Sequence, residues 1–111
     1  MAAHTSEISL LVELDENRVP EKINWTAPDS GVDHSETKAT MLSVWDEKAQ
    51  ETLRIDLWTK EMPVDQMKKY VHQNLRHQAD TLEKAANEGE RAKELRQYAV
   101  EMGEKLGGLK R

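Results

Sequence analysis

The chain has 111 residues and a mass of 12.7 kDa, which is the size of one domain. Its net charge of −5 argues against nucleic-acid binding, because proteins that bind nucleic acid present a basic stripe to the phosphates. It has no cysteine, which excludes disulfides and thiolate metal sites, and no apolar stretch reaches the roughly 18 residues of a membrane span. The first residues carry neither the basic segment nor the apolar segment of a signal peptide, so we expect a cytoplasmic protein.

The N-terminal segment predicts two strands. Apolar residues recur there with a period of two, which is typical of a strand with one buried face; they are Ile8, Leu10, Val12 and Leu14. A turn follows at residues 15–20, and Ile23 and Trp25 then share one face of a short second strand. Residues 27–36 are rich in Pro, Asp, Ser and Gly, so we expect a mobile acidic loop.

Residues 39–58 predict a β-hairpin with a polar turn at 47–50. One face would carry six residues: Thr40, Leu42, Val44, Leu53, Ile55 and Leu57. The opposite face would carry Met41, Trp45 and Trp58. Residues 36–45 can also be written as a helix, but the β pattern of the second arm and the short turn favour the hairpin.

After Pro63 the hydrophobic period changes from two to that of a helix. Pro63 suits the first turn of a helix, where its missing N–H is not needed, and Asp65 complements the positive end of the helix dipole. The segment 87–89 interrupts the pattern, and Gly107 with Gly108 ends it. The apolar positions of the first helix are Val64, Met67, Val71, Leu75, Leu82 and Ala86, and those of the second are Ala92, Leu95, Ala99, Met102, Leu106 and Leu109.

These elements predict an α+β fold, with a four-stranded antiparallel sheet followed by two C-terminal amphipathic helices packed on one face. We expect a single domain over residues 1–111, with a β half at 4–62 and a helical pair at 63–109. The aliphatic face of the sheet is the richer one in apolar residues, so we expect the helices to cover it.

The sequence offers no catalytic, cofactor-binding or metal site. Four histidines are present, but His72 and His77 are five residues apart and so lie on different faces of a helix. Zinc needs three or four converging ligands, which the sequence does not assemble. No nucleophile elbow, phosphate-binding loop or acid–base pair is recognisable. We therefore expect a protein that is not an enzyme and needs no cofactor.

The three tryptophans all lie in the β half, and they have two interpretations. They can be core residues, since an indole buries a large apolar area. Alternatively, Met41, Trp45 and Trp58 form a surface patch, because Trp and Met are enriched at protein interfaces. These three residues are the candidate protein interface, for a partner or for a homo-oligomer.

Several motifs resemble the gliding motility-associated GldC family of the Bacteroidetes group. They are Leu14-Asp15-Glu16-Asn17-Arg18-Val19-Pro20-Glu21 followed by Trp25, then Leu42-Ser43-Val44-Trp45-Asp46, and most strongly Asp56-Leu57-Trp58-Thr59-Lys60-Glu61-Met62-Pro63-Val64-Asp65, continued by Met67 and His72-Gln73. The resemblance covers essentially the whole chain and is best from residue 4 to about residue 82. It implies an accessory protein of the gliding machinery, which these bacteria link to an outer-membrane secretion system, and it brings no catalytic residue.

The expected function is that of a cytoplasmic accessory or adaptor protein of gliding motility, which binds a protein of the gliding or secretion machinery. The alternative is a holdase for exported proteins, because four strands followed by two helices is also the element order of the export chaperone SecB, which is acidic as well.

Overall fold

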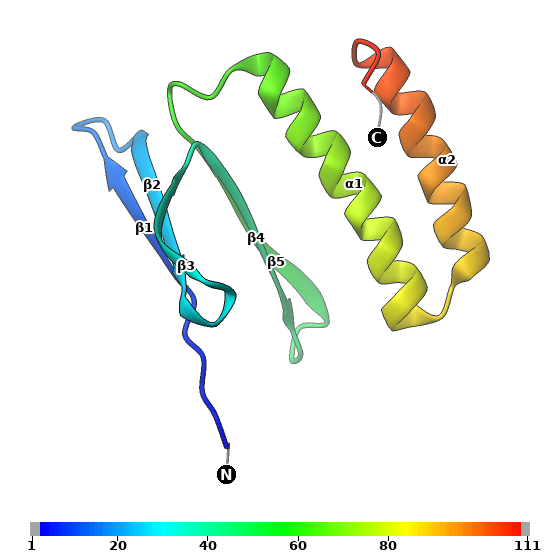
Figure 1. The fold of residues 1–111 in the computed structure, drawn as a ribbon, viewed down its shortest axis with the longest axis horizontal. Helices are drawn as coiled ribbons and strands as arrows, with labels where there is room; N and C mark the ends of the chain where they lie inside the picture. Colours follow the sequence, from blue (N-terminus) through cyan, green and yellow to red (C-terminus); the bar gives the residue numbers. More distant parts are fainter. Residues whose placement is uncertain (1–2, 110–111) are drawn as a thin grey trace. The chain divides into compact units, whose positions relative to one another are not determined.

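The computed structural model describes residues 3–109 and contains five strands, a short 3-10 helix and two α-helices (Figure 1). The chain forms two compact units, one ending at Met62 and the other beginning at Pro63. The boundary lies where the hydrophobic period of the sequence changes. The prediction of one domain, and of helices packed on the sheet, stays a prediction, and each unit is described by itself.

The first unit begins with a three-stranded antiparallel sheet in the order β1-β2-β3. Its strands are β1 (Ser9–Leu14), β2 (Pro20–Ala27) and β3 (Val32–Thr37). In the turn after β1, the Asp15 carboxylate accepts hydrogen bonds from the backbone N–H groups of Asn17 (2.8 Å) and Val19 (2.9 Å). Ile23, on β2, is fully buried and is the largest such side chain of the described residues.

The prediction of a mobile loop at residues 27–36 is wrong. Residues Pro28–Ser30 form the 3-10 helix, Gly31 adopts a left-handed φ of 74°, and β3 then pairs with β2. Only four residues are needed to reverse the chain, because a proline and a glycine set the required backbone angles. The polar residues 33–36 gave no apolar alternation, so the sequence did not reveal that they extend the sheet.

A separate two-stranded sheet follows, formed by β4 (Ala39–Asp46) and β5 (Glu51–Trp58). We call it the ribbon. The predicted hairpin is confirmed, including the turn at residues 47–50, where the Asp46 carboxylate accepts a hydrogen bond from the Lys48 N–H (3.1 Å). The prediction of a single four-stranded sheet is corrected to sheets of three and two strands. Periodicity identifies strands but does not show which strands pair.

The second unit is a pair of helices, α1 (Val64–Ala86) and α2 (Gly89–Lys105). Asn87 ends α1 in the left-handed conformation, with φ 55°, and its N–H bonds the Leu82 carbonyl, so the predicted break is confirmed. The residues buried between the helices are small, apart from one histidine: His72, Ala79, Ala92, Ala99 and Gly103. Small residues allow two helix backbones to approach closely. Larger apolar residues of both helices, among them Leu82 and Leu95, are half-buried.

Candidate protein interface

The register of the ribbon divides its side chains between two faces. Leu42 lies opposite Ile55 and Val44 opposite Leu53, so these four side chains occupy one face, which we call the aliphatic face. The odd-numbered positions of β4 and their partners occupy the other, which we call the tryptophan face. The predicted assignment of residues to the two faces of the hairpin is therefore confirmed.

The tryptophan face presents two exposed indoles that lie at opposite ends of the ribbon. Trp45 is 58% exposed and Trp58 is 56% exposed. Trp58 pairs with Ala39, six positions from Trp45, which at about 3.3 Å per residue separates the two by roughly 20 Å. Met41 is half-buried on the same face. The predicted interface residues therefore share a face without forming one contiguous patch.

The middle of the tryptophan face is polar. Arg54 Nε lies 3.1 Å from Asp56 Oδ2, and this ion pair sits between the two indoles along β5. The other carboxylate oxygen of Asp56 is buried and has no hydrogen-bond partner. A buried acceptor without a donor costs free energy.

The aliphatic face is contiguous and exposed. Leu42, Val44, Leu53 and Ile55 are 43%, 51%, 51% and 55% exposed, respectively. They form two adjacent, directly opposed pairs with no polar side chain between them. Within residues 3–109, no third strand pairs with either edge of the ribbon, so its edge N–H and C=O groups lack strand partners. An isolated two-stranded ribbon is only marginally stable in water, so further contacts should stabilise it.

An ion pair holds the segment after the ribbon. The Lys60 ammonium contacts the Asp15 carboxylate and lies 4.0 Å from Glu21 Oε1, at the β1–β2 turn. Hydrogen bonds from Lys60 and from the Val19 backbone lower the pKa of Asp15, and the bond to Asp15 raises the pKa of Lys60. This pair links β5 to the turn of the other sheet. It also gives Asp15 and Lys60, both in motifs of the family resemblance, a structural role.

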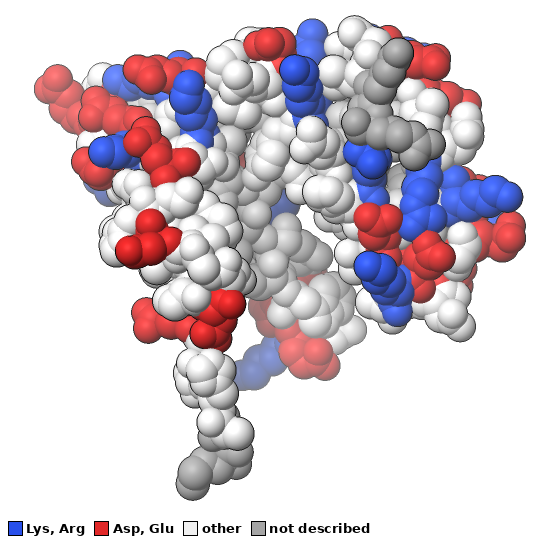
Figure 2. All heavy atoms as spheres, viewed as in Figure 1, with Lys and Arg blue, Asp and Glu red and all other residues white. Residues whose placement is uncertain are grey.

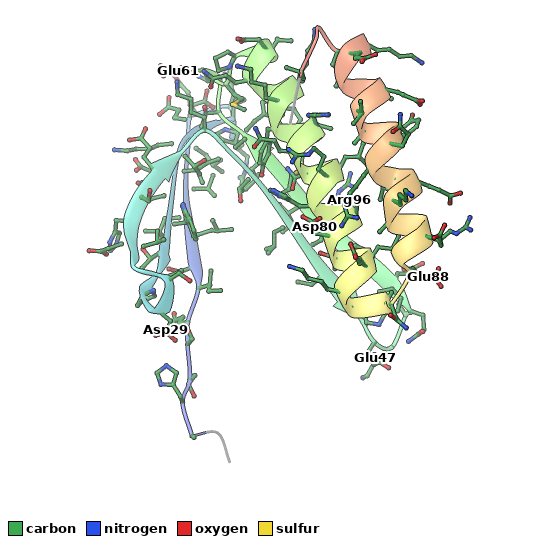
Figure 3. All side chains as sticks on the ribbon, turned by 45° about the vertical axis from the view of Figure 1, so that its right-hand side comes forward. Asp29, Glu47, Glu61, Asp80, Glu88 and Arg96 are labelled. Carbon is green, nitrogen blue, oxygen red and sulfur yellow. The ribbon has the colours of Figure 1, made fainter. Side chains whose placement is uncertain are left out.

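The helical pair carries a groove of about 600 Å³ whose charges compensate each other. Figure 3 shows Arg96 of α2 beside Asp80 of α1, and the Arg96 guanidinium lies 2.9 Å from Asp80 and 2.6 Å from Glu83. These carboxylates raise the pKa of Arg96. Acidic and basic side chains are interspersed over the helical pair (Figure 2). The groove-lining residues are His72, Arg76, Asp80, Arg96, Val100, Glu104, Gly108 and Leu109. The balanced charges do not favour a charged ligand.

The buried position of His72 was not predicted from the sequence. His72 is 3% exposed, and its Nε2 lies 2.9 Å from the Ala99 carbonyl oxygen, to which it can donate. Gly103 is also buried, and a Cβ there would lie 2.8 Å from His72 Nε2 and 2.6 Å from the Leu109 carbonyl oxygen. A glycine inside a helical pattern was the signal for this close contact.

Two further expectations concern metals and membranes. Within residues 3–109, no three His, Asp or Glu side chains are grouped so that they could hold a metal ion. In the same part of the chain, neither helix is long and apolar enough to cross a membrane. The expectation that no metal is needed stays a prediction, since purified protein has to test it.

One comparison with known proteins gives a match. The family model described as "Gliding motility-associated protein GldC-like" matches residues 20–108, which is more than half of the chain. No curated protein and no solved structure gives a match. The family resemblance seen in the sequence motifs is confirmed.

Proposed function

Because the chain belongs to the GldC-like family of gliding motility-associated proteins, we propose that it is a non-enzymatic accessory or adaptor protein of bacterial gliding motility. It acts in the cytoplasm by binding a protein of the gliding or secretion machinery. The family match supports the process. The exposure of large apolar side chains on the ribbon supports the binding mechanism, and this exposure is the observation that carries the proposal.

The tryptophan face is the surface proposed for the partner. Trp45 and Trp58 are large, rigid and more than half exposed, and tryptophan is the residue type most enriched among binding hot spots. The Arg54–Asp56 pair between them supplies polar groups that can fix the orientation of the partner. Two aromatic anchors around a polar centre suit recognition of one specific protein better than non-specific adhesion.

Capture of the partner from a lysate of a gliding bacterium tests the proposal. Trp45→Ser and Trp58→Ser should each reduce capture of a gliding or secretion protein about tenfold or more, because loss of a hot-spot aromatic costs about 2 kcal/mol. Tyr98→Ser is the matched control, since Tyr98 is a 51% exposed aromatic residue of the helical pair. Unchanged capture by both folded tryptophan variants would exclude this face.

The runner-up function is a SecB-like holdase for exported proteins. The aliphatic face favours it, because four exposed apolar side chains without a polar group between them can bind unfolded chains with little selectivity. An aggregation assay with a chemically unfolded client separates the two functions. A holdase suppresses aggregation at near-stoichiometric amounts, whereas an adaptor leaves the aggregation rate unchanged.

A further inference from the structure

The aliphatic face of the ribbon needs a cover that the described residues of the β unit do not supply. Leu42, Val44, Leu53 and Ile55 leave roughly 350–400 Å² of apolar surface exposed. That is about half of the roughly 800 Å² that each partner buries in a standard-size interface. Thr40 and Leu57, both half-buried, continue the same face away from the turn. One such face is thus large enough to form the centre of a dimer interface.

The aliphatic face of one chain is chemically complementary to the same face of a second copy. The four side chains are aliphatic, so contact between two such faces needs no matched donors, acceptors or charges. Two sheets pack face to face when their inner side chains interdigitate, at a separation of about 10 Å. A two-fold interface uses the same patch on both chains, which a uniform aliphatic patch satisfies. We infer that two copies of this chain dimerise by stacking the aliphatic faces of their ribbons.

The carboxylates at the turn fix the relative orientation of the two ribbons. Asp46 lies opposite Glu51, and their positions fall on the aliphatic face at the turn end. If the turns of the two copies were superposed, four carboxylates would gather at one end and repel each other. Antiparallel stacking separates them and places each acidic pair over the Thr40 and Leu57 end of the other copy. Val44 of one copy then lies over Leu42 of the other.

This inference deepens the proposed function, on which it rests for the use of the ribbon in binding. It assigns the aliphatic face to a second copy and leaves the tryptophan face to the partner. The experiment uses purified full-length protein without any partner, so its result is independent of capture from a lysate. Failure of dimerisation would leave partner binding by Trp45 and Trp58 untouched.

The mass in solution tests the dimer. Light scattering or sedimentation equilibrium at micromolar concentration should give twice the chain mass of 12.7 kDa. Ile55→Lys should reduce the mass to that of one chain, because it places a charge in the centre of the interface. Thr52→Lys should leave the dimer intact, since Thr52 is exposed on the same strand but lies opposite Trp45 on the other face.

A milder variant separates weakened association from misfolding. Val44→Thr keeps a β-branched side chain of similar shape and adds one hydroxyl, so it should fold normally and weaken dimerisation about tenfold. Circular dichroism and tryptophan emission check the fold of each variant. A wild-type monomer would overturn the inference and would leave the aliphatic face to the helices of the same chain. A Val44→Thr protein that folds and dimerises like wild type would overturn it too. A dimer that survives in folded Ile55→Lys protein would overturn it as well, and would point to pairing of strand edges instead.

Crosslinking tests the antiparallel arrangement. The natural chain has no cysteine, so single cysteines report cleanly. A mixture of Leu42→Cys and Val44→Cys chains should be joined by a short bifunctional thiol reagent. A mixture of Leu42→Cys and Ser43→Cys chains should not, because position 43 lies on the other face. Equal yields in the two mixtures would contradict stacking of the aliphatic faces.

Discussion

The helical pair buries small side chains, whereas the ribbon exposes large apolar ones. In the helical pair, the buried positions hold alanines, a glycine and one histidine whose ring is hydrogen-bonded to a backbone carbonyl. In the ribbon, the large aliphatic residues and two tryptophans are about half exposed. The backbones of the two helices approach each other closely. The ribbon, in contrast, leaves apolar surface exposed that can bind another protein. Substitutions in the helical pair should therefore change stability, and substitutions on the ribbon should change association.

The largest expected effect is at Gly103 in α2. Gly103→Val should lower the free energy of unfolding by about 3 kcal/mol, because its Cβ would lie 2.6 Å from the Leu109 carbonyl oxygen, a backbone atom that cannot move aside cheaply. Gly89→Ala is the matched control, since a Cβ at Gly89 meets nothing within 4 Å. Urea denaturation measures both. Equal midpoints for the two variants would show that Gly103 is less crowded by Leu109 and by His72 of α1 than these distances indicate.

Leu95 tests whether the half-buried apolar positions of α2 face a core. Leu95→Asp should cost about 2 kcal/mol of unfolding free energy, because a carboxylate loses hydration where the leucine is partly covered. Gln97→Asp, at an exposed position of the same helix, should change it by less than about 0.5 kcal/mol. If thermal unfolding finds no difference between the variants, Leu95 does not contribute to a core.

His72 tests the hydrogen bond that joins the two helices. His72→Phe keeps a buried ring but removes the donor to the Ala99 carbonyl, so we expect a loss of about 1 kcal/mol. His77→Phe, at an exposed position of α1, should be neutral. The midpoints of urea denaturation, compared at one pH, give both values. A stable His72→Phe protein would mean that packing of the ring suffices.

The smallest expected effect is the acid response of the ion pair on the helical pair. A hydrogen bond from Arg96 lowers the pKa of Asp80 below its ordinary value of 3.8. A lowered pKa in the folded state contributes stability above the unfolded pKa, and this contribution is lost as the pH falls through the folded value. In Arg96→Gln, an NMR titration should show the Asp80 carboxyl returning toward its ordinary pKa. An unchanged titration would show that the pair does not persist in solution, as is common for exposed ion pairs.

The alternation of Leu42 and Val44 with Met41 and Trp45 gave the hairpin and its faces correctly, because the side-chain period of a strand is a local property. The break at residues 87–89 was also readable, since Asn and Gly tolerate left-handed backbone angles. The sequence did not reveal β3, because its residues 33–36 are polar and show no apolar alternation.

The sequence predicted which residues of the candidate interface share a face, but not whether they form a contiguous surface. Met41, Trp45 and Trp58 share a face, as predicted, but the register separates the two indoles and places the Arg54–Asp56 pair between them. The contiguous patch is on the aliphatic face, which the sequence predicts to be covered by the helices. The period of two along a strand shows which side chains lie on the same face. Whether apolar side chains form a contiguous patch also depends on which residues of the neighbouring strand lie opposite them.

The sequence by itself determined the two strands of the ribbon, the two helices, the boundary near Pro63 and the family, because these follow from short-range periodicity, turn residues and motifs. Only the tertiary structure decided that the strands form two sheets, that His72 and Gly103 lie between the helices, and that Leu42, Val44, Leu53 and Ile55 are exposed. Strand pairing and burial depend on contacts between residues far apart in the chain. An apolar residue carries the same signal in the sequence whether its cover comes from its own chain or from another.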